Sequence, residues 1–311
     1  MWRTRDPGRF VVGVNLPWVG YGTDIGASAW YPDGGLARQP ASLETLDRTF
    51  ATLARDGISV ARVFLLCDLR SGVQFDAAEV PVAIDHAVIR DVAALVDAAR
   101  RHGMRLLPVL LDFHLCGPRE IANGVQLGGR SGLISDDDAS DALVERVVRP
   151  LVEAFGRDDT IAAWDVINEP EWCLRGGLFS RRSTVPFDSM RRFLARAVEC
   201  IHQIAAQPVT VGSAGTWKLD LVRDLDLDFY QIHWYDRFGW PVLTTPVAEL
   251  GLGSHPVILG EFSGCSARLP EVLDAAKDAG YEGALVWSVL AGDEHSAYPA
   301  EMLDWIRSAR P

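Results

Sequence analysis

Two glutamates, each at the end of an apolar run, have the side chains best suited to chemistry. The run "AAWDVIN" (162–168) leads directly into Glu169, and the run "PVILGEF" (256–262) carries Glu261 next to its end. Cleavage of a glycosidic bond requires two facing carboxyl groups. One protonates the leaving oxygen, and the other attacks the anomeric carbon or activates water there. The pattern therefore predicts a pair of reactive carboxyl groups, if the fold brings the two segments together.

Other apolar runs also end in polar or aromatic residues, namely Asn15, Arg62, His114, Asn168, His233, Tyr235 and Trp287. Arg62 would hold one glutamate ionised by charge pairing, and the Tyr235 hydroxyl could donate to the same carboxylate. If Glu261 is that anion, its charge would raise the pKa of Glu169 and keep it protonated, as a general acid requires. Asn168 could then bond a sugar hydroxyl beside the reacting carbon.

Eight β-rich apolar runs alternate with helical patterns along the chain. The runs cover 10–15, 60–66, 105–113, 162–168, 208–213, 228–235, 256–262 and 283–289. The helical patterns cover 42–56, 83–102, 139–155, 187–206, 217–224, 244–252, 270–279 and 299–309, with Ser42 as the expected N-cap of the first. Continuously apolar strands, each followed by a helix, indicate a closed parallel sheet. The predicted fold is therefore α/β, a (β/α)8 TIM barrel that forms a single domain over residues 1–311.

A doubly wound open sheet is the structural alternative. It is disfavoured because the segment after the first strand, "NLPWVGYGTDIG", does not fit a dinucleotide-binding loop. In a (β/α)8 barrel the chemistry lies at the C-terminal ends of the strands, where all the residues named above are expected. The long segments 16–41 and 114–138 also follow strands, so we expect them to cover that face.

The composition bounds partners and location. A net charge of −12 and a pI near 5.0 argue against nucleic acid and anionic membranes as partners. The segment "MWRTRDPGRF" has no apolar signal core, and no run is long enough to span a membrane, so the sequence as written predicts a cytoplasmic protein, or a secreted one if a leader was removed. Five cysteines without framework spacing favour a reducing compartment. The oligomeric state is not indicated.

Taken together, these motifs resemble glycoside hydrolase family 5, a cellulase/mannanase-like family among the clan A retaining glycosidases. The resemblance rests on "INEP" after the fourth strand, "HWY" in the sixth and "GEFSG" at the seventh, and it covers nearly the whole chain. The eight recurring active-site residues of that family match Arg62, His114, Asn168, Glu169, His233, Tyr235, Glu261 and Trp287. The resemblance implies Glu169 as acid/base, Glu261 as nucleophile and Trp287 as the aromatic floor under the attacked sugar. In "LLDFHLC", either Asp112 or His114 could face the site.

Five more tryptophans follow strands and could stack on sugar rings: Trp18, Trp30, Trp172, Trp234 and Trp240. Four cysteines also lie just beyond strand ends, namely Cys67, Cys116, Cys173 and Cys265, but their spacing matches no zinc pattern. The segment "GDEHS" (292–296) could offer metal ligands, yet a polar loop that shapes a subsite explains it better. The sequence predicts neither a metal nor a cofactor, and the expected partner is a carbohydrate substrate.

The predicted function is a retaining β-glycoside hydrolase that cleaves a β-linked gluco- or manno-configured saccharide by double displacement. It requires the two carboxyl groups to lie about 5–5.5 Å apart. A retaining transglycosylase would use the same residues. A metal-dependent barrel hydrolase is a weaker alternative, because it would want a His-x-His pair where residues 15–17 read "NLP". A non-catalytic barrel should have lost a carboxylate. The sugar, and endo or exo action, depend on the loops 16–41 and 114–138.

Overall fold

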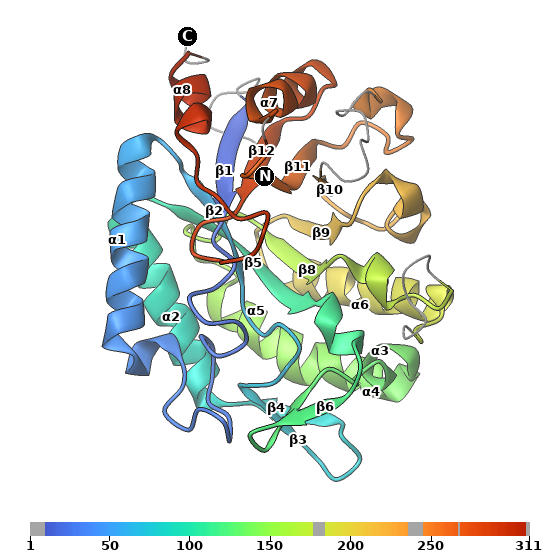
Figure 1. Cartoon of the computed structure of the whole chain (residues 1–311). Coiled ribbons are helices and arrows are strands. Elements are labelled where there is room, and N and C mark those ends of the chain that lie inside the picture. Colours follow the sequence, from blue (N-terminus) through green and yellow to red (C-terminus); the bar gives the residue numbers. More distant parts are fainter. Residues whose placement is uncertain (1–9, 177–183, 236–244, 267, 309–311) are drawn as a thin grey trace.

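A closed barrel of eight parallel strands forms the centre of the protein (Figure 1). The computed structural model describes residues 10–176, 184–235, 245–266 and 268–308. The barrel strands are β1 (Val11–Asn15), β2 (Val60–Phe64), β5 (Arg105–Asp112), β8 (Trp164–Asn168), β9 (Val209–Ser213), β10 (Tyr230–Trp234), β11 (Val257–Ser263) and β12 (Gly283–Trp287). They pair in chain order, and β12 closes the ring on β1. The predicted (β/α)8 barrel is confirmed.

Helices surround the barrel and cover the outer faces of its strands (Figure 1). They are α1 (Pro40–Asp56), α2 (His86–Arg101), α3 (Gly132–Ser135), α4 (Asp137–Leu143), α5 (Arg149–Phe155), α6 (Phe187–Ile204), α7 (Leu269–Asp278) and α8 (Ala300–Ser308). A π-helical turn at Val144–Val148 joins α4 to α5, so the helix predicted for 139–155 is continuous but not regular. The helices predicted near 217–224 and 244–252 are only short 3-10 turns, at Thr216–Leu221 and Val247–Glu249.

The first helix begins earlier than its sequence suggested. Pro40 occupies its first turn and Gln39 precedes it, whereas Ser42 lies inside the helix and donates its hydroxyl to the Gln39 Oε1 at 3.2 Å. Proline suits a first turn because its missing N–H has no partner there in any helix. The prediction of Ser42 as the N-cap is therefore wrong.

Two small hairpins extend the loops that follow β2 and β5. The strands β3 (Val73–Phe75) and β4 (Pro81–Ile84) form the first, and β6 (Glu120–Ala122) and β7 (Val125–Leu127) form the second. Figure 1 shows the two hairpins near each other at one end of the molecule. The loop after β1 is held by Asp91 of α2, whose carboxylate accepts hydrogen bonds of 2.9 Å from two backbone amides of that loop.

The barrel interior is apolar at one end and polar at the other. A layer of buried residues fills the N-terminal half, composed of Val11, Val60, Leu107, Ala163, Phe229, Ile258 and Leu285. A larger core lies outside the barrel, among strands and helices. The packed lower layer leaves the C-terminal ends of the strands for polar side chains. Among the described residues, no helix is both long and apolar enough to cross a membrane.

Candidate active site

The buried guanidinium of Arg62 is the centre of the polar network. Its Nε lies 2.9 Å from the Asp165 Oδ2, one Nη lies 2.5 Å from the Glu261 Oε1, and the other donates to the Asn168 Oδ1 at 2.9 Å. The Asn15 Oδ1 accepts a further bond at 3.1 Å. Since the Arg62 side chain has no exposed surface, these four partners replace its hydration. One positive charge is thus shared between two carboxylates.

Glu261 lies near the C-terminal end of β11, and both its oxygens accept hydrogen bonds. One faces Arg62, and the other accepts from the Tyr235 hydroxyl at 2.7 Å. Burial raises the pKa of Glu261, whereas His233, Arg62 and the tyrosine hydroxyl act against that rise. The hydrogen bonds and the nearby cation therefore favour the charged form of a carboxyl group that burial alone would neutralise.

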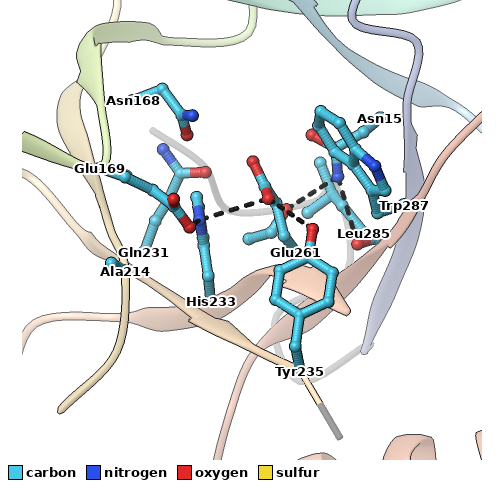
Figure 2. Close-up of polar contacts among 12 residues, drawn as sticks. Asn15, Asn168, Glu169, Ala214, Gln231, His233, Tyr235, Glu261, Leu285 and Trp287 are labelled. Atoms are coloured by element: carbon cyan, nitrogen blue, oxygen red, sulfur yellow. Dashed lines mark hydrogen bonds and ion pairs between the residues drawn. The ribbon is translucent and has the colours of Figure 1, made fainter. Parts of the chain in front are cut away.

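The imidazole of His233 lies between the two glutamates (Figure 2). Its Nδ1 is 2.8 Å from the Glu169 Oε1 and 3.4 Å from the Glu261 Oε2. Burial lowers the pKa of His233 to about 4, so the ring is neutral at pH 7. Within the part of the chain that the structure describes, its Nε2 has no hydrogen-bond partner. We therefore assign the single ring proton to Nδ1, where it can be donated to Glu169.

Glu169 directly follows β8 and has a left-handed backbone, with φ 49° and ψ 52°. Its amide donates to the Gly212 carbonyl at 2.7 Å, and its Oε2 accepts from the Trp172 indole N–H at 2.7 Å. One carboxylate oxygen of Glu169, one of Glu261 and one ring nitrogen of His233 all lie within 4.8 Å of one another. This separation fits direct attack by one carboxylate and is shorter than the ~6.5–9.5 Å of an inverting pair.

Trp287 ends β12 as part of an aromatic group beside Glu261. Its ring centroid lies 5.9 Å from that of Trp18 and 6.2 Å from that of Phe64, and its indole N–H donates to the Asp293 Oδ2 at 2.8 Å. Trp18 lies in the loop after β1 and packs near Trp287, and its contact with a sugar stays a prediction. Asp293 belongs to the "GDEHS" segment, so that segment supports this indole.

Asp112, and not His114, faces the network at the end of β5. The Asp112 side chain is 4% exposed and its Oδ2 accepts from the Asn168 amide at 3.3 Å, whereas the His114 side chain is 57% exposed. The His114 Nδ1 lies 2.5 Å from the Asp112 Oδ1, so the histidine is one residue removed from Asn168. The strand ends at Asp112 and His114 lies on the turn after it, so His114 reaches the network through Asp112, and its contact with a substrate stays a prediction.

The remaining predicted tryptophans differ in position. Trp172 contacts Glu169, as described, and Trp30 stacks on Tyr31 with 5.7 Å between centroids. Trp234 is 8% exposed and packs in the outer core, because it follows the inward-facing His233 on the same strand and so points to the opposite side. Its prediction as a sugar-contacting residue is therefore corrected. Trp240 lies outside the described residues.

Several buried polar residues of the site were not predicted. Asp165 accepts from Gln231 and from the Gly212 amide as well as from Arg62, at 2.8 Å and 3.1 Å for the first two. Glu171 is 1% exposed, and burial raises its pKa to about 8. An acid inside the apolar run "WDVIN" was a usable signal, because a charge in a buried strand requires a partner. Gln231 carried no such signal.

The Glu169, His233 and Glu261 group has the donor atoms of a metal site, but its surroundings fit it poorly. Arg62 lies 2.5 Å from Glu261, so a divalent cation there would meet a fixed positive charge. Each glutamate also already accepts a hydrogen bond, from Tyr235 or Trp172. The cysteines past the strand ends, Cys67, Cys116 and Cys173, are buried free thiols, and Cys265 is an exposed one.

The chain is similar in sequence to enzymes that cleave mannan. No family model matches the chain. The mannan endo-1,4-beta-mannosidase of Mytilus edulis is 24% identical over 323 residues, covering 90% of this chain and 83% of the relative. The Cryptopygus antarcticus enzyme of the same name is also 24% identical, over 92% of this chain and 82% of its own. The predicted resemblance to the family 5 mannanase-like enzymes is thereby confirmed.

Solved structures share the fold along most of the chain. The beta-1,4-D-mannanase from Cryptopygus antarcticus superposes with a TM-score of 0.80 at 21% identity, covering 96% of this chain and 90% of that one. A GH5_18 enzyme from Streptomyces cattleya, solved in complex with Manb1-4GlcNAc, gives a TM-score of 0.68 at 18% identity, covering 94% of this chain and 74% of that one. The barrel is therefore the fold of these enzymes.

Proposed function

We propose that this chain is a retaining endo-β-1,4-mannosidase with one catalytic barrel domain. The observation that carries the proposal is the arrangement of Glu169 and Glu261, whose oxygens lie within 4.8 Å across His233. The substrate class is supported by the activity of both relatives, which are mannan endo-1,4-beta-mannosidases. The arrangement of the two glutamates supports a glycosidase, and the activity of the relatives favours a manno-configured over a gluco-configured substrate.

In the first step Glu261 is the nucleophile. Its carboxylate attacks the anomeric carbon while Glu169 donates its proton to the glycosidic oxygen, and the leaving sugar departs with that proton. Arg62 and Tyr235 favour the anionic form of Glu261 and oppose the rise in its pKa that burial causes. Mutual repulsion of the two carboxyl groups favours a single proton on the pair, which the proposal assigns to Glu169.

In the second step Glu169 is the base. With the leaving sugar gone, it takes a proton from water, which attacks the glycosyl–Glu261 ester and releases a product of unchanged anomeric configuration. The indole N–H of Trp172 holds one oxygen of Glu169, and His233 holds the other. These two contacts fix the carboxyl group for both proton transfers. Asn168, held by Arg62 and Asp112, is in position to bond a hydroxyl of the attacked sugar.

The first experiment compares soluble β-1,4-mannan and its oligosaccharides with β-1,4-glucan and cello-oligosaccharides of equal length. We expect oligosaccharides of mixed length from the interior of mannan, with the β-anomer as the first product in a proton NMR time course. Turnover of the glucans but not of mannan would mean that the substrate is gluco-configured. An α-anomer as the initial product would refute the retaining mechanism.

Two variants assign the roles of the glutamates. Glu261→Gln should abolish turnover on every substrate, because the amide cannot form the glycosyl ester. Glu169→Ala should spare aryl β-mannosides with good leaving groups far more than mannan, since such groups depart without a proton. Equal losses on both substrates would contradict Glu169 as the acid.

A further inference from the structure

Asp165 is a buried acid of β8 that the proposed reaction steps do not use. Its side chain has no exposed surface. Its Oδ2 lies 2.9 Å from the Arg62 Nε and accepts from the Gln231 amide at 2.8 Å. Its Oδ1 accepts from the Gly212 backbone amide at 3.1 Å. These donors come from three strands, β2, β10 and β9, so the carboxylate is fixed beside Arg62 from several sides.

The charge of Arg62 is balanced by two acids. Among the residues that the structure describes, Arg62 forms ion pairs with Asp165 and Glu261 alone. Burial lowers the pKa of Arg62, but the two carboxylates together raise it above its ordinary value, so the guanidinium stays charged without any exposed surface. A buried cation that loses all its counter-ions carries a large free-energy cost, because neither water nor an opposite charge then compensates it.

The proposed reaction neutralises one of these acids in every cycle. When Glu261 attacks, one of its oxygens forms a bond to the anomeric carbon, and the leaving oxygen departs with its electron pair and the proton of Glu169. The ester at Glu261 is neutral, and the negative charge has moved to Glu169. In the described part of the chain Glu169 forms no ion pair with Arg62, since its carboxylate contacts His233. The glycosyl–enzyme therefore leaves Arg62 with Asp165 as its counter-ion.

We propose that Asp165 is a positioning residue that acts through Arg62: it stays as the counter-ion of Arg62 while Glu261 is esterified, and so stabilises the glycosyl–enzyme intermediate. The inference rests on the proposed function and adds a residue that balances charge in the middle of the reaction. Without the charge of Asp165, the whole attraction of Arg62 would fall on Glu261. A carboxylate held in this way is a weaker nucleophile and a better leaving group. Loss of the charge should hence slow formation of the intermediate and speed its hydrolysis.

The test measures the two steps separately. The probe is a mannobiosyl β-fluoride with a second fluorine beside the anomeric carbon of the reacting sugar, which slows both steps, while the fluoride leaving group keeps the first one measurable. In Asp165→Asn we expect labelling of Glu261, followed by mass spectrometry, to slow by about 10-fold or more, and reactivation of the labelled enzyme to accelerate by about 10-fold or more. Asp165→Glu keeps the charge and should reactivate as slowly as wild type.

Gln231→Leu is the matched control, because it removes a 2.8 Å hydrogen bond to the same Asp165 oxygen but no charge. It should change both rates in the same direction or leave them unchanged. In Asp165→Asn, rates that both fall or both stay at the wild-type value would overturn the role of Asp165. A wild-type enzyme that forms no labelled species would instead overturn the proposed retaining mannosidase itself.

A second measurement needs no substrate and decides the matter even if Asp165→Asn folds poorly. Glu261→Gln imitates the neutral ester, so it should unfold near the wild-type urea midpoint, because Arg62 keeps Asp165 as its counter-ion. The double variant with Asp165→Asn leaves no counter-ion, and its midpoint should fall by more than the sum of the two single changes. A midpoint lowered by about a third or more in Glu261→Gln alone, or additive changes in the double variant, would overturn the proposal.

Discussion

A methyl group added at Gly260 should displace His233 from its position between the two glutamates. The Cβ of Gly260→Ala would lie 2.8 Å from the Gln231 Oε1, 3.0 Å from the His233 Cδ2 and 3.1 Å from its Nε2. Relaxed contacts of this kind are ~3.5 Å or longer, so the imidazole must move by about 0.5 Å. Among the described residues no hydrogen bond holds the ring at Nε2, so the motion falls on the 2.8 Å contact between Nδ1 and Glu169.

The expected effects on stability and on activity differ. Overpacking of this size should lower the free energy of unfolding by about 1–3 kcal/mol. Misplacement of a catalytic group by part of an ångström should lower kcat/KM on mannan by about 10- to 100-fold. Urea unfolding measures the first quantity, and initial rates at saturating and limiting substrate measure the second.

Gly13→Ala is the matched control. Its Cβ would lie 2.9 Å from the Val60 carbonyl oxygen and 3.2 Å from the Leu285 Cγ, in the apolar lower layer of the barrel. It should therefore cost comparable stability without loss of activity. Wild-type kcat/KM in Gly260→Ala, or an equal activity loss in Gly13→Ala, would refute the role given to the position of His233.

Three other substitutions test the surroundings of the glutamates. Tyr235→Phe removes a 2.7 Å hydrogen bond from the Glu261 carboxylate, so kcat/KM should fall ~10- to 100-fold and its acidic limb should move to higher pH; an unmoved limb would contradict the assignment. Trp172→Phe removes the donor to Glu169 and keeps an aromatic ring, so mannan turnover should fall more than turnover of an activated aryl mannoside. Burial raises the pKa of Glu171 in the folded protein to about 8. A carboxyl group with a raised pKa stabilises the fold fully below its unfolded pKa, and this contribution is lost as the pH rises through the folded pKa. Between pH 6 and pH 9, the free energy of unfolding measured in urea should therefore decrease less for Glu171→Gln than for wild type. Equal decreases would contradict the raised pKa of Glu171.

The sequence predicted the barrel because its strands are buried on both faces. Continuously apolar runs such as "VILGEF" mark such strands directly, so all eight were located within a few residues. The polar residues at their ends were equally visible, since Arg62, Glu169 and Glu261 interrupt apolar segments. Helix starts were less visible: Ser42 looked like a cap, but the proline two residues earlier had already started the helix.

The sequence did not predict the direction of side chains at and after the last residue of a strand. Asp112 and His114 are two residues apart and equally polar, and only the end of β5 at Asp112 decides that the aspartate points inward. Trp234 is a different case, because period-two alternation with His233 on the same strand was a usable signal for its outward direction.

The hydrogen bonds of Asn15 relate activity to the order of folding. Its amide donates to the carbonyls of Gly260 and Leu285, 245 and 270 residues later, and its oxygen accepts from Arg62. The side chain that orients the central cation is itself fixed by the last two strands. On a ribosome, the enzyme should therefore stay inactive until β12 has emerged and docked against β1. In refolding experiments the return of mannan cleavage should report ring closure, later than the return of helical circular dichroism.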